Sequence, residues 1–443
     1  MDKPVKGCGL FRAALCAMVI TLLWCRILPL AAMDLPEVQA EDRTALMAVN
    51  ISTARSVKSL LDNNTTTKLT MAPGTTLEIA LPQGQGIAGI YLRWDKPPKP
   101  WRLTWEGGSI EGGQHQFLHE YLALPATITN ATLRIGEEEA LLCDIFGFSE
   151  GALPAWVQVW ELPYQRADLL LLPTHADDEH LFFGGTMPYY AGELGRKVQV
   201  AYLTHHWAEP YRPHELLNGL WTVGIRHYPV IGPYTDYYAN SLAAAKALYN
   251  TEAMVNYQVE LLRRFRPLVV IGHDIDGEYG HGVHMMNTDT LRQALTLSGD
   301  SGWGEGQSDS EPWEVPKTYL HLYKENHMYM NWDEPLEHFD GATAFMMAEK
   351  GFACHKSQQA WFSVRRTGVH DCRSFGLYRS NRGPDIIGGD FMEGLAPYPN
   401  EGQKWEWPVL PKYNLERYGP AGQGVYFSRR MDSQESINLR AAF

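Results

Sequence analysis

Residues 168–179 read DLLLLPTHADDE, and this stretch decides the fold class of the chain. The uninterrupted apolar run before Pro173 is typical of a short strand that is buried on both faces of a sheet. His175, Asp177 and Asp178 follow that strand directly, at the end where open α/β sheets place their ligand sites. The stretch therefore predicts an α/β layer with a polar loop at the edge of its sheet.

Apolar runs and helical stretches continue to alternate after this segment. The pattern predicts further strands at residues 198–204, 228–231, 267–272 and 318–323. It predicts helices at residues 185–194, 214–224, 241–265 and 283–297. We therefore expect an α/β, Rossmann-like layered domain with a mostly parallel sheet.

A second polar segment follows the predicted strand at residues 267–272. It holds His273, His281 and His284, interspersed with acidic residues. Because both polar segments follow buried strands of one sheet, they can converge on a single point. Imidazole and carboxylate groups are good ligands for Zn²⁺, and Asp177 adds a carboxylate that can accept a proton from water. The alternatives are an acidic helix N-terminus and a set of solvated histidines.

The region before this domain has a different sequence pattern. Short alternating runs are separated by Gly and Pro turn signals, which predicts a β-sandwich. The runs are 69–71, 76–81, 89–94, 101–105, 131–135 and 141–146, preceded by a polar, partly helical segment at 41–66. The texture of residues 87–148 resembles a discoidin-type (coagulation factor 5/8 type C) module, which implies binding to a surface glycan. A scaffold that shields the catalytic domain is the alternative.

The N-terminus is typical of a secretory signal. Lys3, Lys6 and Arg12 precede an apolar run from Ala13 to Cys25, and small residues follow. The run is shorter than the roughly 20 residues that span a bilayer. We expect residues 1–40 to be a signal peptide and the protein to be secreted or extracytoplasmic, with an uncleaved N-terminal anchor as the alternative.

Composition excludes several classes of protein. With 45% hydrophobic and 20% charged residues, the chain is globular rather than disordered. A net charge of −13 without a basic run argues against a nucleic-acid partner. Beyond the predicted leader, Cys143, Cys354 and Cys372 leave two possibilities open, which are three free thiols or one disulfide between Cys354 and Cys372.

Several motifs together resemble the PIG-L (LmbE-like) N-acetyl deacetylases. They are His-x-Asp-Asp-Glu at 175–179 with Gly184-Gly185, Arg212-x-x-Glu215, His281-x-x-His284, the segment 312–319, and His-x-Ser-Gln at 355–358. The resemblance covers about residues 165–395. It implies a zinc-dependent hydrolase that removes the N-acetyl group from an N-acetylglucosamine-type sugar or glycoconjugate and gives acetate and a free amine. A metal hydrolase of another amide or ester, and a glycan-binding surface protein with a decayed catalytic domain, are the alternatives.

The resemblance also implies roles for individual residues. His175, Asp178 and His284 are the implied zinc ligands. Asp177 is the implied general base, and His281 the implied group that polarises or protonates during amide cleavage. The substrate-binding candidates are Arg212, Glu215 and Asp236, for which a surface ion pair and a turn residue are the alternatives. His205 and His206 are expected in the wall of the cleft.

Two motifs depart from the family pattern. Ala176 and Gly282 stand where the family usually has proline, and Val283 stands where it usually has aspartate. A carboxylate that would support the metal ligands is therefore missing, and Asp274, Asp276 or Glu278 is expected to replace it. The predicted organisation is a signal peptide at 1–40, a sandwich at 41–160, a deacetylase domain at 161–395, and an extension at 396–443 that packs on that domain.

Overall fold

The computed structural model describes residue 1 and residues 38–53, 56–303, 310–385 and 388–399 of the 443-residue chain. The predicted signal peptide lies outside the described residues apart from residue 1 and residues 38–40 and stays a prediction. Most of the predicted C-terminal extension also lies outside them. Among the described residues, no helix combines the length and apolar character needed to cross a bilayer.

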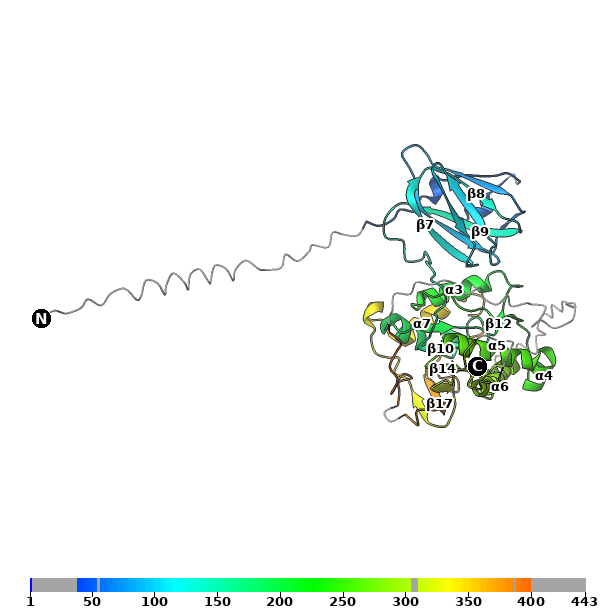
Figure 1. Ribbon diagram of the computed structural model, residues 1–443, viewed down its shortest axis with the longest axis vertical. Coiled ribbons are helices and arrows are strands. Elements are labelled where there is room, and N and C mark those ends of the chain that lie inside the picture. Colours follow the sequence, from blue (N-terminus) through cyan, green and yellow to red (C-terminus); the bar gives the residue numbers. More distant parts are fainter. Residues whose placement is uncertain (2–37, 54–55, 304–309, 386–387, 400–443) are drawn as a thin grey trace.

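The N-terminal region forms two antiparallel sheets (Figure 1). The first has the order β1-β3-β8-β5-β6 and the second the order β2-β9-β4-β7. The strands are β1 (Ala48–Ile51), β2 (Leu69–Met71), β3 (Thr76–Ala80), β4 (Ile87–Trp94), β5 (Trp101–Trp105), β6 (Gly108–Gly112), β7 (His119–Ile128), β8 (Asn130–Ile135) and β9 (Ala140–Phe148). Two short 3-10 helices, η1 (Thr44–Leu46) and η2 (Lys58–Leu60), accompany them.

Alternation of side chains explains how these sheets bury a core. In β3 and β5, Leu77, Ile79 and Leu103 are buried while their neighbours face outward, as the two-residue period of a strand requires. They share one hydrophobic cluster with Leu92 of β4 and Leu142 of β9. All six runs predicted here are strands, whereas β1, β6 and β7 were not predicted. The discoidin-type assignment and the domain boundaries stay predictions.

The C-terminal region is an α/β layer around a six-stranded mixed sheet, of order β11-β10-β14-β15-β17-β16. Its strands are β10 (Leu169–Leu171), β11 (Val198–Val200), β14 (Val269–Gly272), β15 (Lys317–His321), β16 (His327–Tyr329) and β17 (Ser374–Ser380). Neighbouring strands from β11 to β15 pair in parallel, and β17 runs antiparallel to β15 and β16. A separate parallel pair joins β12 (Thr204–His205) and β13 (Tyr234–Thr235).

Helices surround this sheet (Figure 1). The α-helices are α2 (Asp178–Leu181), α3 (Arg212–Thr222), α4 (Leu242–Leu248), α5 (Thr251–Phe265), α6 (Gly282–Leu297) and α7 (Ala344–Phe352). The π-helix η3 (Met187–Glu193) and the 3-10 helices η4 (Glu278–Gly280) and η5 (Glu337–Phe339) complete the set. The α/β class predicted from the sequence is confirmed.

Two predicted elements differ from the structure. The helix predicted at 241–265 is split, because the Asn250 side chain accepts a hydrogen bond from the Ala253 backbone N–H and begins a new helix there. The strand predicted at 228–231 forms only isolated bridges, among them Val230 with Ala201. The helix is split by a local hydrogen bond, whereas the segment at 228–231 bonds to residues distant in sequence, such as Glu161 and Val200, and apolar periodicity reports neither.

The cysteines do not form the disulfide that was left open by the sequence. Cys143, Cys354 and Cys372 are all free. Cys372 is fully buried against Gly184, whereas Cys354 lies near the Thr222 hydroxyl at 3.5 Å, so the two thiols have different surroundings.

The last described residues pack on the α/β layer. The Tyr398 backbone N–H donates to Asp168 Oδ1 at 2.7 Å, and the Tyr398 hydroxyl donates to the Arg266 carbonyl at 2.8 Å. Residues 396–399 of the predicted extension therefore lie beside the start of β10.

Candidate metal centre

The polar loops after β10 and β14 lie side by side, because these two strands pair in parallel. Both strands are buried along their whole length. One loop carries His175 and leads into α2, which begins with Asp178, while the other carries His273 and leads into α6, which holds His284. The fold thus places the two polar segments found in the sequence at one edge of the sheet.

The three implied ligands converge. His175 Nδ1 lies 2.9 Å from His284 Nε2 and 3.3 Å from Asp178 Oδ2. His284 Nε2 lies 3.2 Å from the same oxygen. Ligands about 2.0–2.1 Å from a tetrahedral zinc ion are roughly 3.3 Å apart, so the spacing and the donor set fit such an ion. Two other buried sets of donors at this point could also hold an ion, namely His175 with His281 and His284, and Asp178 with His273 and His284.

Backbone N–H groups of the same turn hold the carboxylate of Asp178 in place. Asp178 Oδ2 accepts hydrogen bonds from the backbone N–H groups of His175 at 2.7 Å and Thr174 at 3.1 Å. Burial alone would raise the pKa of the Asp178 carboxyl, but His284, His175 and His273 hold it well below its usual range. The carboxylate is therefore ionised and fixed in position.

Asp177 has a strained backbone. Its φ of 137° lies in a region that non-glycine residues rarely adopt. Its N–H donates to Glu179 Oε2 at 2.9 Å, and its Oδ1 lies 3.8 Å from the Arg212 guanidinium. Burial raises the pKa of the Asp177 carboxyl well above its usual value, against the opposing effect of Arg212. A raised pKa and a strained backbone are features of functional carboxylates.

His281 is the N-cap residue of α6 and faces the same point. Its ring lies 5.0 Å from that of His175 and 4.9 Å from that of His284, measured between centroids. Its Nδ1 is buried without a hydrogen-bond partner among the described residues. Burial and the neighbouring histidines lower the pKa of His281 to about 2, so the ring is neutral. The exposed Tyr238 lies beside His281, with their ring centroids 5.1 Å apart.

His273 and Glu278 support the centre, and sequence reasoning gave His273 no role. His273 Nε2 lies 3.3 Å from Asp178 Oδ2, and its Nδ1 lies 3.3 Å from Glu278 Oε1. The same Glu278 oxygen lies 2.8 Å from His321 Nδ1. The Glu278 carbonyl lies 3.4 Å from His284 Nδ1, which leaves His284 Nε2 to face the centre. Of the three acids expected to replace the missing carboxylate, Glu278 is the one that makes these contacts.

Two of the three substrate-binding candidates lie at the centre. Arg212 donates to the Ala176 carbonyl at 2.6 Å. Asp236 lies 3.2 Å from His175 Nε2 and 3.4 Å from His206 Nδ1. These contacts place both side chains next to the proposed ligands and bring His206 into the wall of the site.

The third candidate, Glu215, points elsewhere. Its two oxygens accept hydrogen bonds from the Ser357 N–H at 2.9 Å and the Ser357 hydroxyl at 2.6 Å. Glu215 thus links α3 to the His-x-Ser-Gln segment. His205 lines a small apolar cavity together with Leu118, Trp207 and also His206.

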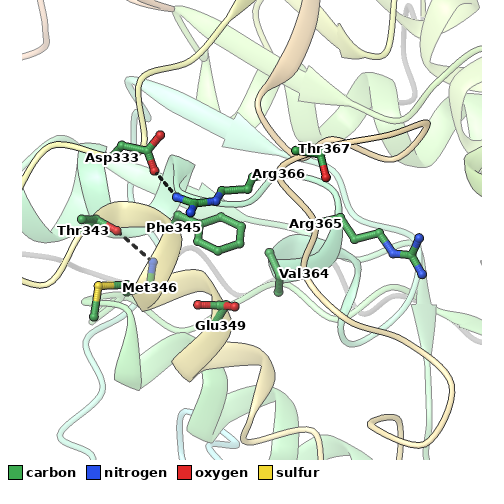
Figure 2. A pocket seen from close by; sticks show the side chains of 9 residues that line it. All are labelled: Asp333, Thr343, Phe345, Met346, Glu349, Val364, Arg365, Arg366 and Thr367. Carbon is green, nitrogen blue, oxygen red and sulfur yellow. Dashed lines mark hydrogen bonds and ion pairs between the residues drawn. The ribbon is translucent and has the colours of Figure 1, made fainter.

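A larger pocket, of about 800 Å³, opens beside α7 (Figure 2). Among its lining residues, Arg366 donates to Asp333 at 2.7 Å, and the Thr343 side chain caps α7 by accepting from the Met346 N–H; Figure 2 marks both contacts with dashed lines. None of the residues of the metal centre lines this pocket. The pocket and the centre are therefore separate features.

Part of this chain matches a known protein family. Residues 170–295 match the family described as PIG-L: GlcNAc-PI de-N-acetylase. A 1D-myo-inositol 2-acetamido-2-deoxy-alpha-D-glucopyranoside deacetylase 2 from Saccharopolyspora erythraea is 31% identical over 176 residues, which cover 34% of this chain and 63% of that protein. A deacetylase with the same substrate in its name, from Streptomyces avermitilis, is 28% identical over 185 residues, covering 36% and 62%. The chain thus spans less than two thirds of the length of these relatives.

Solved structures with partial similarity include two carbohydrate-related proteins. An N,N'-diacetylchitobiose deacetylase from Pyrococcus horikoshii has a TM-score of 0.33 and 18% identity, covering 44% of this chain and 72% of that one. A family 32 CBM from C. perfringens NanJ, in complex with galactose, has a TM-score of 0.22 and 10% identity, covering 25% and 99%. The family match and the curated relatives, which are named deacetylases, agree with the resemblance noted in the sequence motifs. The part of this chain that is similar to the PIG-L family is therefore residues 170–295, which include His175, Asp178 and His284.

Proposed function

We propose that this chain is a zinc-dependent N-deacetylase that acts on an N-acetylglucosamine-type sugar or glycoconjugate. The observation that carries the proposal is the convergence of His175, Asp178 and His284 beside Asp177 and His281. The substrate class is supported by the relatives, whose names specify deacetylation of an acetamido-glucopyranoside.

Each residue has a defined task in this proposal. Zinc held by His175, Asp178 and His284 would polarise the acetyl carbonyl and lower the pKa of a water molecule. Asp177 removes a proton from the attacking water as general base, and that proton passes to the amine nitrogen when the C–N bond breaks. The neutral His281 ring donates a hydrogen bond to the oxygen that becomes negatively charged.

The proposed base depends on its neighbours. Arg212 fixes the Asp177 loop through the Ala176 carbonyl, and its charge lies close to the Asp177 carboxylate. Burial keeps the pKa of Asp177 high, which strengthens it as a proton acceptor. Tyr238, exposed beside His281, offers an aromatic face on which a sugar ring can pack.

The test is acetate release from N-acetylglucosamine oligomers and from an N-acetylglucosaminyl inositol, with zinc restored. Asp177→Asn keeps the shape of the side chain but removes the base, so kcat should fall by about 100-fold or more. Zinc content should stay unchanged, because Asp177 is not a proposed ligand. Asp276→Asn, an exposed acid in the other loop, is the matched control. An unchanged rate in Asp177→Asn would overturn the mechanism, and no acetate release from any acetylated sugar would overturn the function.

A further inference from the structure

A second cluster of metal-ligating side chains lies next to the centre described above. It consists of Glu179, His180 and His355, each of them fully buried. Glu179 and His180 belong to α2, directly after Asp178, and His355 follows the end of α7. Glu179 Oε1 lies 3.4 Å from Nε2 of His180 and 3.4 Å from Nε2 of His355. The spacing is close to that of the first centre.

Most polar side-chain atoms of this cluster lack hydrogen bonds among the described residues, although Glu179 Oε2 accepts one from the Asp177 N–H. Glu179 Oε1 and both ring nitrogens of His180 and of His355 have no hydrogen-bond partner among the described residues. The short distances to Glu179 therefore do not correspond to aligned N–H···O contacts. Buried polar atoms in folded proteins are almost always hydrogen-bonded or bound to an ion, so this arrangement needs a partner.

The space between these atoms is kept free by a glycine. A β-carbon at Gly219 of α3 would lie 2.6 Å from His180 Nε2, 3.0 Å from His355 Nε2 and 3.1 Å from the Gly351 carbonyl oxygen. Any larger residue at Gly219 would fill this polar cradle. A side chain at Gly219 would therefore crowd the Nε2 atoms of His180 and His355, which are the atoms that lie near Glu179 Oε1.

We propose that this cradle is a second metal site, which binds a divalent transition cation through Glu179, His180 and His355. Ligands about 2.0–2.1 Å from a tetrahedral zinc ion are roughly 3.3 Å apart, which matches the separations around Glu179 Oε1. Two imidazoles with one carboxylate suit zinc, and also iron or manganese.

The burial of the ligands assigns this site a structural role. All three are inaccessible to solvent, so no open position is left for water or substrate. The cation would join α2, which follows the strained Asp177, to the segment after α7. It would thereby hold the turn that carries the first centre. The proposal does not rest on the deacetylase activity, because it concerns the number of metal ions that the chain binds.

The experiment is metal analysis of the full chain after loading with zinc and removal of loosely bound ions. Wild type should hold two zinc ions per chain, and His284→Ala should retain one. His355→Ala and Gly219→Ala should each lose one ion and keep the other. Gly219→Ala is informative because it removes no ligand and only occupies the cradle. His338→Ala, which alters an exposed histidine, is the control and should hold two ions.

A chelator-release measurement on wild type keeps the test independent of how the variants fold. Two phases of zinc release of equal amplitude support the proposal, and a single phase of one ion per chain overturns it. The proposal is also overturned if wild type holds two ions and both His355→Ala and Gly219→Ala retain them. Since no outcome depends on acetate release, failure of the second site is distinct from failure of the proposed function.

Discussion

Both prolines that the family pattern leads one to expect are replaced by residues whose N–H groups make hydrogen bonds. The Ala176 N–H donates to His206 Nε2 at 3.1 Å, and the Gly282 N–H donates to the Ala239 carbonyl at 2.7 Å. Proline has no N–H and could make neither contact. At each of these two positions, a backbone hydrogen bond that proline could not make therefore holds the loop in place.

Gly282 allows a close approach that no other residue would permit. A β-carbon there would lie 2.1 Å from the Ser241 carbonyl oxygen, so Gly282→Ala must displace the start of α6. Since α6 carries His284, we expect zinc affinity at the first centre to fall by about tenfold or more. The free energy of unfolding should fall by about 1–3 kcal/mol.

The measurements are a competition titration with a chelator and unfolding in denaturant. Gly299→Ala is the matched control, because a β-carbon there meets only ordinary contacts, the nearest at 3.6 Å. Equal zinc affinities for Gly282→Ala and Gly299→Ala would show that the position of α6 does not control the ligand.

At the scale of elements, strand ends explain what the sequence could predict. The buried runs that became β10 and β14 are apolar without interruption, and the polar residues after them identified the centre. The role of His273 could not be predicted, because its contact with Asp178 depends on the parallel pairing of the two strands. Contacts between loops far apart in sequence carry no local pattern.

There is also a physical reason why the sequence did not predict strands β6 and β7. The ten-residue β7 contains Pro125, and proline argues against a strand unless the strand is at an edge. β7 is an edge strand of its sheet, so its Pro125 is tolerated. In β6, Gly108 and Gly112 resembled turn signals, but they lie opposite Trp105 and Trp101 of β5 in the pairing.

Substitution of Glu278, in η4, tests whether the loop after β14 supports the proposed metal ligand Asp178 in the loop after β10. Its carboxylate contacts His273 and His321, and His273 in turn contacts Asp178. Glu278→Gln keeps the size of the side chain but removes the charge that orients His273. Zinc affinity at the first centre should fall by about 10- to 100-fold, because groups that orient ligands have effects of this size.

Asp276→Asn, in the same loop and exposed, is the control for the loss of one negative charge. The same chelator competition measures both variants. If Glu278→Gln and Asp276→Asn bind zinc equally well, Glu278 does not support the centre.

At the scale of the molecule, the N-terminal sheets contact the α/β layer through a buried pair of histidines. His119 of β7 and His214 of α3 are joined by a 2.8 Å hydrogen bond between Nε2 and Nδ1. His119 Nδ1 also lies 2.7 Å from the Gln158 side-chain oxygen. Nearby, the Leu118 N–H donates to the Tyr228 hydroxyl, and the rings of Phe117 and Tyr228 stack at 4.4 Å. Figure 1 shows α3 on the side of the layer that faces the sheets.

This pair makes the contact sensitive to pH. Burial and the positive charges of Arg93 and Lys68 lower the pKa of His214 to about 3, and burial, His214 and Arg93 lower that of His119. Both rings are therefore neutral in the folded protein, whereas unfolded histidines titrate near pH 6.5. The stability that the neutral pair contributes is present above about pH 6.5 and is lost as the pH falls towards the folded value of about 3.

The expected outcome concerns the free energy of unfolding at pH 7.5 and at pH 5.0. For His214 alone, the loss between these values is about 2 kcal/mol, from 1.36 kcal/mol per pH unit below 6.5. His214→Gln removes this titration, so its stability should fall by about 2 kcal/mol less than that of wild type over the same interval. His327→Gln, which replaces an exposed histidine in β16, is the control and should behave as wild type. Groups that do not contact His214 titrate alike in the three proteins and cancel in the comparison, whereas His119 loses its partner in His214→Gln. Equal pH dependence in wild type and His214→Gln would exclude His214 as the source of the sensitivity.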